Sequence, residues 1–183
     1  MTNSKNLIDK KKIFRTKCID KLRFYNNISK IKKDKDICSR ILELILLYKP
    51  KTVLAYIPLD IEVDILPLIN KLKKDKICEV YVPFMVDKTF KAVKYRLPLK
   101  KKRFGIKEPN NSTLKATIDL AIVPIVGTDN TNRRVGFGRG MYDRYFENLA
   151  IQPTKIFTQR VLCKSKNTVT SSHDIKADFI ITK

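Results

Sequence analysis

The sequence predicts an α/β protein with three layers, α/β/α, around a mostly parallel central sheet. Two amphipathic helical segments open the chain, over residues 7–25 and 34–48. Short and almost continuously apolar segments then alternate with stretches long enough for crossover helices, which is typical of parallel strands buried on both faces. A length of 183 residues with 43% apolar content suits one domain with its own core. We therefore predict a single domain over residues 1–183.

The first helical segment shows apolar residues at four-residue spacing. Phe14, Cys18 and Leu22 recur in this way, and Lys11 and Arg15, also four apart, share a neighbouring face. The second segment ends before a proline, which cannot continue a helix. Further helices are predicted over residues 64–74 and from residue 141 onward.

Three buried parallel strands are predicted over residues 52–57, 79–82 and 118–123. Each is followed by a proline (Pro58, Pro83, Pro124), and proline cannot donate to a ladder, so we expect pairing to stop there. Further strands are predicted over residues 155–162 and 177–182. The alternating lysines of residues 90–97 predict an edge strand or a hairpin arm. Ligands of such Rossmann-like sheets bind outside the carboxyl ends of the strands, where Glu62, residues 84–85 and the glycine loop described next should converge.

A glycine-rich loop is the most informative local feature. Residues 134–143 read Arg-Val-Gly-Phe-Gly-Arg-Gly-Met-Tyr-Asp and hold three of the 5 glycines. Alternate glycines allow positive φ and close approach of the main chain to an anion. Arg133, Arg134 and Arg139 add donors, and the helix that follows would face the anion with its positive end. The loop predicts a phosphate cradle, with an ordinary strand-to-helix turn as the alternative, and Asp143 suits a magnesium ion on the same polyphosphate.

Composition limits the other classes of function. The net charge of +21 invites a nucleic-acid interpretation, but the lysines are spread from Lys5 to Lys183, which favours solvated surface over a dedicated nucleic-acid site. The four cysteines, at 18, 38, 78 and 163, show neither zinc-site nor disulfide-framework spacing. No segment has the pattern of a signal peptide or the length of a membrane span. We therefore expect a cytoplasmic protein with reduced thiols and, for lack of any assembly element, a monomer.

The glycine loop, ending in Tyr142-Asp143-Arg144 and preceded by Val123-Pro124 and Asp129, resembles the signature of the 5-formyltetrahydrofolate cyclo-ligase family. The resemblance extends along almost the whole chain. Its other motifs, in order, are Lys11-Lys-Ile-Phe-Arg15, Tyr56-Ile-Pro with Glu62-Val-Asp64, Phe104-Gly-Ile-Lys-Glu-Pro109, Gln159, and His173-Asp174 with Ala177-Asp178.

This resemblance implies an ATP- and magnesium-dependent enzyme. In the family's reaction the formyl oxygen of 5-formyltetrahydrofolate is phosphorylated, N10 attacks the activated carbon, and ring closure releases phosphate and leaves ADP and 5,10-methenyltetrahydrofolate. Small molecules, and neither a membrane nor a specific nucleic acid, would be the partners. Arg134 and Tyr142 would be catalytic. ATP would contact Lys11, Arg15, Arg134, Gly136, Phe137, Gly138, Arg139, Gly140, Met141 and Tyr142.

The folate would contact Ile57, Glu62, Phe137, Gly138, Arg139, Gly140 and Met141, with the Glu62 carboxylate accepting hydrogen bonds from the pterin ring. Asp143 and Asp174 would hold magnesium. The chain departs from the family at Met141, where relatives often have tyrosine. Without the resemblance, Lys11 and Arg15 would be interpreted as solvated surface and Glu62 as a helix cap. Two other functions stay open: a non-enzymatic basic nucleic-acid-binding protein, and a homologue of the same fold that acts on another substrate.

Overall fold

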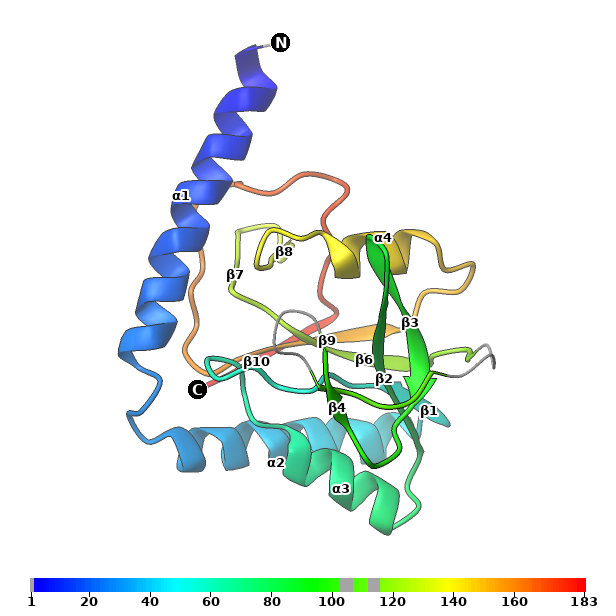
Figure 1. Cartoon of the computed structure of the whole chain (residues 1–183). Coiled ribbons are helices and arrows are strands. Elements are labelled where there is room, and N and C mark those ends of the chain that lie inside the picture. The colour runs from blue at the N-terminus through cyan, green and yellow to red at the C-terminus, as the bar shows by residue number, and fades with distance from the viewer. Residues whose placement is uncertain (1, 103–106, 112–115) are drawn as a thin grey trace.

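The computed structural model describes residues 2–102, 107–111 and 116–183. Its centre is a six-stranded sheet, in the order β10-β9-β6-β1-β2-β3 (Figure 1). These strands are β1 (Thr52–Leu54), β2 (Glu79–Val86), β3 (Thr89–Lys94), β6 (Leu120–Pro124), β9 (Thr154–Gln159) and β10 (Phe179–Thr182). All neighbours pair in parallel except β2 and β3, whose antiparallel hairpin forms one edge. The predicted parallel sheet and the edge strand near residues 90–97 are confirmed.

Two small antiparallel sheets complete the strand structure. One pairs β4 (Lys100–Lys101) with β5 (Lys107–Glu108), and the other pairs β7 (Gly127–Thr128) with β8 (Arg134–Val135). Because β8 contains the first residues of the glycine loop, its pairing with β7 fixes where that loop leaves the body of the protein.

The helices lie on both sides of the sheet. They are α1 (Thr2–Phe24), α2 (Lys30–Tyr48), α3 (Leu66–Lys74) and α4 (Met141–Glu147). Helices α2 and α3 cover one face and the short α4 the other, while α1 runs along the side of the molecule with its first turns projecting (Figure 1). The predicted three-layer α/β/α architecture, with a helix beginning at Met141, is confirmed.

Residues of the central strands alternate between two apolar layers. In β1 and the residue after it, Val53 and Ala55 join the core beneath α2 and α3, whereas Leu54 joins the core beneath α4. In β9, Ile156 and Phe157 divide in the same way. Both faces of the strands are therefore buried, which explains why their sequences lack the polar alternation of half-exposed strands.

The prediction that Pro83 ends its strand is wrong. Strand β2 continues to Val86, with Pro83 opposite Ala92 of β3. The Tyr95 N–H donates to the Val80 carbonyl, so alternation makes Pro83 part of a pair without hydrogen bonds to β3. Its nitrogen faces the side where β1 has already ended, and no ladder donor is lost.

The prediction of reduced thiols is wrong for one pair. Cys18 of α1 and Cys163, which follows β9, form a disulfide across 145 residues of sequence. Both sulfurs are buried with Val126, and Phe14 packs against them. Nothing in the spacing indicates this pair, because only the fold brings α1 beside that loop. Cys38 and Cys78 are free thiols.

Two features complete the description. No described helix has both the length and the apolar content needed to span a membrane. In the motif at residues 104–109, residues 104–106 lie outside the described ranges, while Glu108 is buried and accepts a hydrogen bond from the Met85 N–H at 3.3 Å.

Candidate active site

A cavity of about 270 Å³ opens at the carboxyl ends of the central strands. Its walls are mostly apolar and contain one acidic group, Glu62, and two basic groups, Arg134 and Arg139. The lining residues are Tyr56, Ile57, Leu59, Glu62, Pro83, Met85, Phe90, Pro124, Arg134, Phe137, Arg139, Gly140, Met141 and Tyr142. The cavity brings together Glu62, Met85 and the glycine loop, as expected for the carboxyl ends of parallel strands. Phe84 instead lines the neighbouring hollow described below.

Glu62 lies in the segment between β1 and α3. Its Oε2 accepts a hydrogen bond from the Leu59 N–H at 2.8 Å, and the Glu62 N–H donates to the Leu59 carbonyl at 3.0 Å. It does not cap α3, because Asp64 accepts from Leu66 N–H instead. Burial raises the pKa of Glu62 to about 7, although the Leu59 N–H and Arg134 act in the opposite direction. A carboxylate in this state gains stability from any further N–H donor that enters the cavity.

Arg134 and Tyr142 form the centre of the opposite wall. The Arg134 side chain is 6% exposed, its Nε donates to the Pro124 carbonyl at 3.0 Å, and its guanidinium lies 4.7 Å from the centre of the Tyr142 ring. Burial raises the pKa of Tyr142 well above its usual range, so the phenol keeps its proton. The ring also meets Phe90 edge to face. A fixed cation therefore stands beside an O–H donor.

An arginine side chain packs against each of the three glycines of the loop. Gly138 and Gly140 have φ of 96° and 62°, the positive values predicted from the sequence. Gly136 is needed for space, since a Cβ there would overlap the Arg134 guanidinium. Arg15 of α1 donates to the Gly136 carbonyl at 2.7 Å and lies against Gly138. Close approach of arginine and backbone is thus the local reason for the glycines.

Lys11 and Asp174 meet across 163 residues of sequence. The Lys11 ammonium lies 2.5 Å from Asp174 Oδ1, and the two side chains are 21% and 10% exposed. Asp174 Oδ2 accepts from the Ser171 N–H at 2.8 Å, which closes a turn before β10. Arg133 stabilises this turn by donating through Nη1 to the Ser172 and Asp174 carbonyls, and its role as a donor to an anion stays a prediction. Lys11 and Arg15 are therefore not merely solvated surface.

Asp143 lies in the first turn of α4 and reaches the loop that contains Asp174. Its Oδ1 accepts from the Ile175 N–H at 3.2 Å, next in sequence to Asp174, and its Oδ2 is 4.0 Å from Arg134 Nη1. Among the residues that the structure describes, no three His, Cys, Asp or Glu side chains gather closely enough to hold a metal. Asp143 and Asp174, linked through the Ile175 N–H, nevertheless suit magnesium, which binds through one or two carboxylates with waters and substrate phosphates.

A second and wider hollow of about 610 Å³ adjoins the cavity and shares three of its lining residues, Met85, Arg139 and Met141. Arg144 of α4 and Lys88 at the tip of the β2–β3 hairpin also line it. The Arg144 Nε donates to the Lys88 carbonyl at 2.7 Å, which ties that hairpin to α4. The cavity and this hollow therefore share a wall made by Met85, Arg139 and Met141.

Two buried polar groups near the site escaped site prediction from the sequence. Asp129 is fully buried; burial opposes its ionisation, but hydrogen bonds from Thr131, Thr170 and the Val169 N–H outweigh it and lower the pKa to about 2. Arg160 is 1% exposed and reaches Asp34, Asn26 and the main chain at Glu62. For Arg160 the sequence offers no signal beyond a charged residue after a buried strand.

The comparisons with known proteins agree with this geometry. The model of the 5-formyltetrahydrofolate cyclo-ligase family matches residues 7–183. The chain belongs to this family. A 5-formyltetrahydrofolate cyclo-ligase of Mycoplasma genitalium is 28% identical over 137 residues, which are 72% of this chain and 73% of that protein. That of Mycoplasma pneumoniae is 45% identical over 49 residues, only 27% of this chain and 26% of that protein.

Solved structures of the cyclo-ligase family share the fold. The 5,10-methenyltetrahydrofolate synthetase of Aquifex aeolicus matches with a TM-score of 0.74 at 25% identity, over 94% of this chain and 89% of that one. The corresponding enzyme of Mycoplasma pneumoniae matches with a TM-score of 0.70 at 24% identity, over 93% and 97%, which supports the fold. The predicted family and fold class are confirmed, and with them a ligase family that converts 5-formyltetrahydrofolate to 5,10-methenyltetrahydrofolate.

Proposed function

We propose that this chain cyclises 5-formyltetrahydrofolate in a reaction that consumes ATP and requires magnesium, and that the cavity and the glycine loop hold the two substrates side by side. The observation that carries the proposal is the convergence of Glu62, Arg134 and Tyr142 in one mostly apolar cavity, with Lys11, Arg15, Asp143 and Asp174 linked to its rim. Phosphorylation of the formyl oxygen prepares its carbon for attack by N10, and the C–O bond then breaks with loss of phosphate.

The folate side of the site consists of the mostly apolar cavity. A flat pterin ring suits walls made by Ile57, Met85 and Met141, and its amino and ring N–H groups suit the Glu62 carboxylate. Since the pKa of Glu62 is about 7, its ionised form predominates only above neutral pH. Donors on the bound ring stabilise that form, so binding releases a proton at neutral pH.

The phosphate side consists of cations on three separate segments. Lys11 and Arg15 come from α1, Arg134 from β8, and Arg139 from the glycine loop. Lys11 uses one of its three donors on Asp174, and Arg15 one of its five on Gly136, so each retains donors for phosphate oxygens. Arg134, fixed against Pro124 and Tyr142, is the proposed group that stabilises charge on the transferred phosphoryl group.

Asp143 and Asp174 are the proposed magnesium ligands. Neither lines the cavity, but Asp143 lies 4.0 Å from Arg134, which does, and it accepts a hydrogen bond from Ile175, the residue next to Asp174. Asp143 and Asp174 would hold the ion through carboxylate oxygens, and its charge would offset part of the phosphate charge. The protein's own contribution is to hold the two carboxylates through the Ile175 and Ser171 N–H groups.

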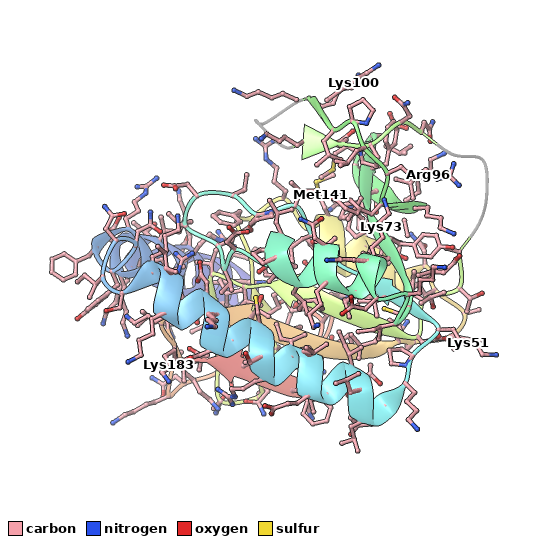
Figure 2. The ribbon with its side chains drawn as sticks, turned by 90° about the horizontal axis from the view of Figure 1, so that it is seen from below. Lys51, Lys73, Arg96, Lys100, Met141 and Lys183 are labelled. Carbon is pink, nitrogen blue, oxygen red and sulfur yellow. A yellow bond between two sulfur atoms is a disulfide. The ribbon has the colours of Figure 1, made fainter. Side chains whose placement is uncertain are left out.

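The partners in this proposal are small molecules, and the charge distribution supports that choice. Figure 2 shows Lys51 and Lys183 towards opposite ends of the molecule, with Lys73, Arg96 and Lys100 on other elements. Such scattered cations differ from the basic groove with interleaved aromatic residues that non-specific binding of single strands requires. The monomeric state and the cytoplasmic location stay predictions.

The direct test is a spectroscopic assay of purified protein with 5-formyltetrahydrofolate. Formation of the methenyl product, which absorbs in the near ultraviolet, is expected only when ATP and magnesium are both present. Chelation of magnesium should abolish turnover and restoring it should recover turnover. A folded, nucleotide-free preparation that gives no product with both present would overturn the proposal.

A further inference from the structure

We infer that Arg160 is a positioning residue for the folate pocket, acting through the segment that carries Glu62; the inference rests on the proposed function for its catalytic consequence. Arg160 follows β9 and does not line the cavity. It is one of the largest fully buried side chains in the described parts of the chain, at 1% exposure. A buried guanidinium needs a reason, because transferring its charge out of water costs several kcal/mol before any partner is counted.

The partners of Arg160 come from two distant segments. Its Nε and Nη2 donate to the two carboxylate oxygens of Asp34 in α2, at 2.7 and 3.0 Å, and its Nη1 donates to Asn26 Oδ1 at 2.7 Å. The remaining donors reach the carbonyls of Ile61 and Glu62. The guanidinium therefore connects the helical layer to the main chain that presents Glu62.

The same segment is fixed at the next residues by two more buried groups. Asp34 Oδ2 also accepts from the Asp64 N–H at 3.2 Å, and the Tyr56 hydroxyl donates to the Val63 carbonyl at 2.9 Å. The backbone from residue 61 to 64 thus has every residue hydrogen-bonded to a buried side chain. The Glu62 carboxylate is left facing the cavity, with the Leu59 N–H as its own partner.

This arrangement matters because a carboxylate that binds a ring edge must lie in the plane of the donors. A displacement of roughly 1 Å at such a group costs on the order of 100-fold in rate. Ion pairs of this kind are often replaced by apolar side chains without loss of stability. The use of Arg160 and Asp34 here is therefore explained by the position they impose on Glu62 rather than by the stability they add.

The test replaces both charges at once, as Arg160→Met with Asp34→Leu, so that no buried charge is left unpaired. The control is Lys183→Met with Asp36→Leu, which removes a different ion pair of α2, in which the Lys183 ammonium lies 2.6 Å from Asp36. Lys183 lies at the edge of the molecule near α2 (Figure 2). The Arg160/Asp34 variant should still unfold cooperatively, with a lower melting temperature than the wild type because Asn26 Oδ1, the Glu62 carbonyl and the Asp64 N–H lose their partners. Its KM for 5-formyltetrahydrofolate should rise at least tenfold, with the KM for ATP unchanged.

Two further readouts separate positioning from general loosening. The pH dependence of folate binding that the raised pKa of Glu62 predicts should flatten in the Arg160/Asp34 variant and persist in the control. Amide hydrogen exchange at residues 61–64 of the ligand-free protein should accelerate only in the Arg160/Asp34 variant. Unchanged exchange in that segment overturns the inference whether or not the wild type turns over folate, and a wild type without turnover overturns the proposed function alone. A folded variant with unchanged folate KM also overturns the inference.

Discussion

The two sides of the site are held together in different ways. On the folate side, the segment around Glu62 is held by hydrogen bonds to three buried side chains, Tyr56, Asp34 and Arg160. On the phosphate side, α1 supplies Lys11 and Arg15, whose contacts with Asp174 and Gly136 are partly exposed. A pocket for a flat, mostly apolar ring must have its shape before the ring binds. A polyphosphate, in contrast, attracts cations by its own charge, so these cations can be held less rigidly beforehand.

The way in which α1 is attached sharpens this comparison. Among the α1 side chains that the structure describes, only Cys18 and Leu22 are buried. Ile8 and Ile13 are 63% and 70% exposed. In addition to the contacts of Lys11 and Arg15, the disulfide to Cys163 and the hydrogen bond from Lys21 to the Leu162 carbonyl connect α1 to the rest of the protein. The phosphate side therefore depends on a helix with little apolar attachment of its own.

The largest effect is expected where the two sides meet, at Arg134. Arg134→Ala should lower kcat by roughly 100- to 1000-fold, because a fixed donor to developing charge is lost. The KM values for both substrates should change much less. Arg40→Ala, which removes an exposed arginine that donates to the Thr182 carbonyl, is the control. Steady-state kinetics with a circular dichroism check of folding decide the matter, and a kcat within about twofold of wild type would remove Arg134 from the mechanism.

The next effect concerns the attachment of α1. Replacing Cys18 and Cys163 together by alanine should lower the free energy of unfolding by about 2 to 4 kcal/mol, since a long loop is no longer closed in the unfolded chain. The KM for ATP should rise while the KM for folate stays constant. Denaturant unfolding with and without a reducing agent measures the first part, with Cys78→Ala as the control for loss of a free thiol. A wild type equally stable in both conditions would contradict the covalent connection.

Glu62 predicts an effect of pH with a definite sign. Its pKa is about 7 in the folded protein, against roughly 4.3 in an unfolded chain, so the folded state holds an extra proton between these values. Its contribution to stability is therefore complete below pH 4 and is lost as the pH rises through 7. Glu62→Gln should match the wild type at pH 4 and exceed it by on the order of 2 kcal/mol at pH 8.

The same variant should bind folate more weakly and without dependence on pH, because the carboxylate acceptor is gone. Unfolding curves and folate titrations across this range measure both effects. An unchanged affinity for folate at pH 8 would argue against Glu62 as the pterin anchor and in favour of a different substrate for this fold.

The smallest effect is expected at the rim. Lys11→Ala should raise the KM for ATP by about tenfold, as expected for one charge-assisted contact, and leave the folate KM unchanged. Lys12→Ala, the adjacent exposed lysine, should leave both unchanged. If the two substitutions behave alike, Lys11 serves only as surface charge.

Residues with a local signature were predicted well from the sequence. Gly138 and Gly140 have the positive φ expected of alternating glycines, and α4 begins at Met141 as its apolar pattern indicated. What escaped prediction depends on contacts between distant segments. Cys18 and Cys163 pair across the fold, Pro83 is tolerated because β1 ends beside it, and Arg160 meets Asp34 across 126 residues. No spacing rule contains such contacts, because they arise only when the layers pack.

The most direct test of the central claim follows one oxygen atom. If the γ-phosphate of ATP is transferred to the formyl oxygen in this site, 5-formyltetrahydrofolate labelled with ¹⁸O at that oxygen must deliver the label to the released phosphate. Mass spectrometry of the phosphate after turnover is expected to show one labelled oxygen for each methenyl product formed. Unlabelled phosphate, with the ¹⁸O found in water, would contradict the proposed meeting of the two substrates beneath the glycine loop.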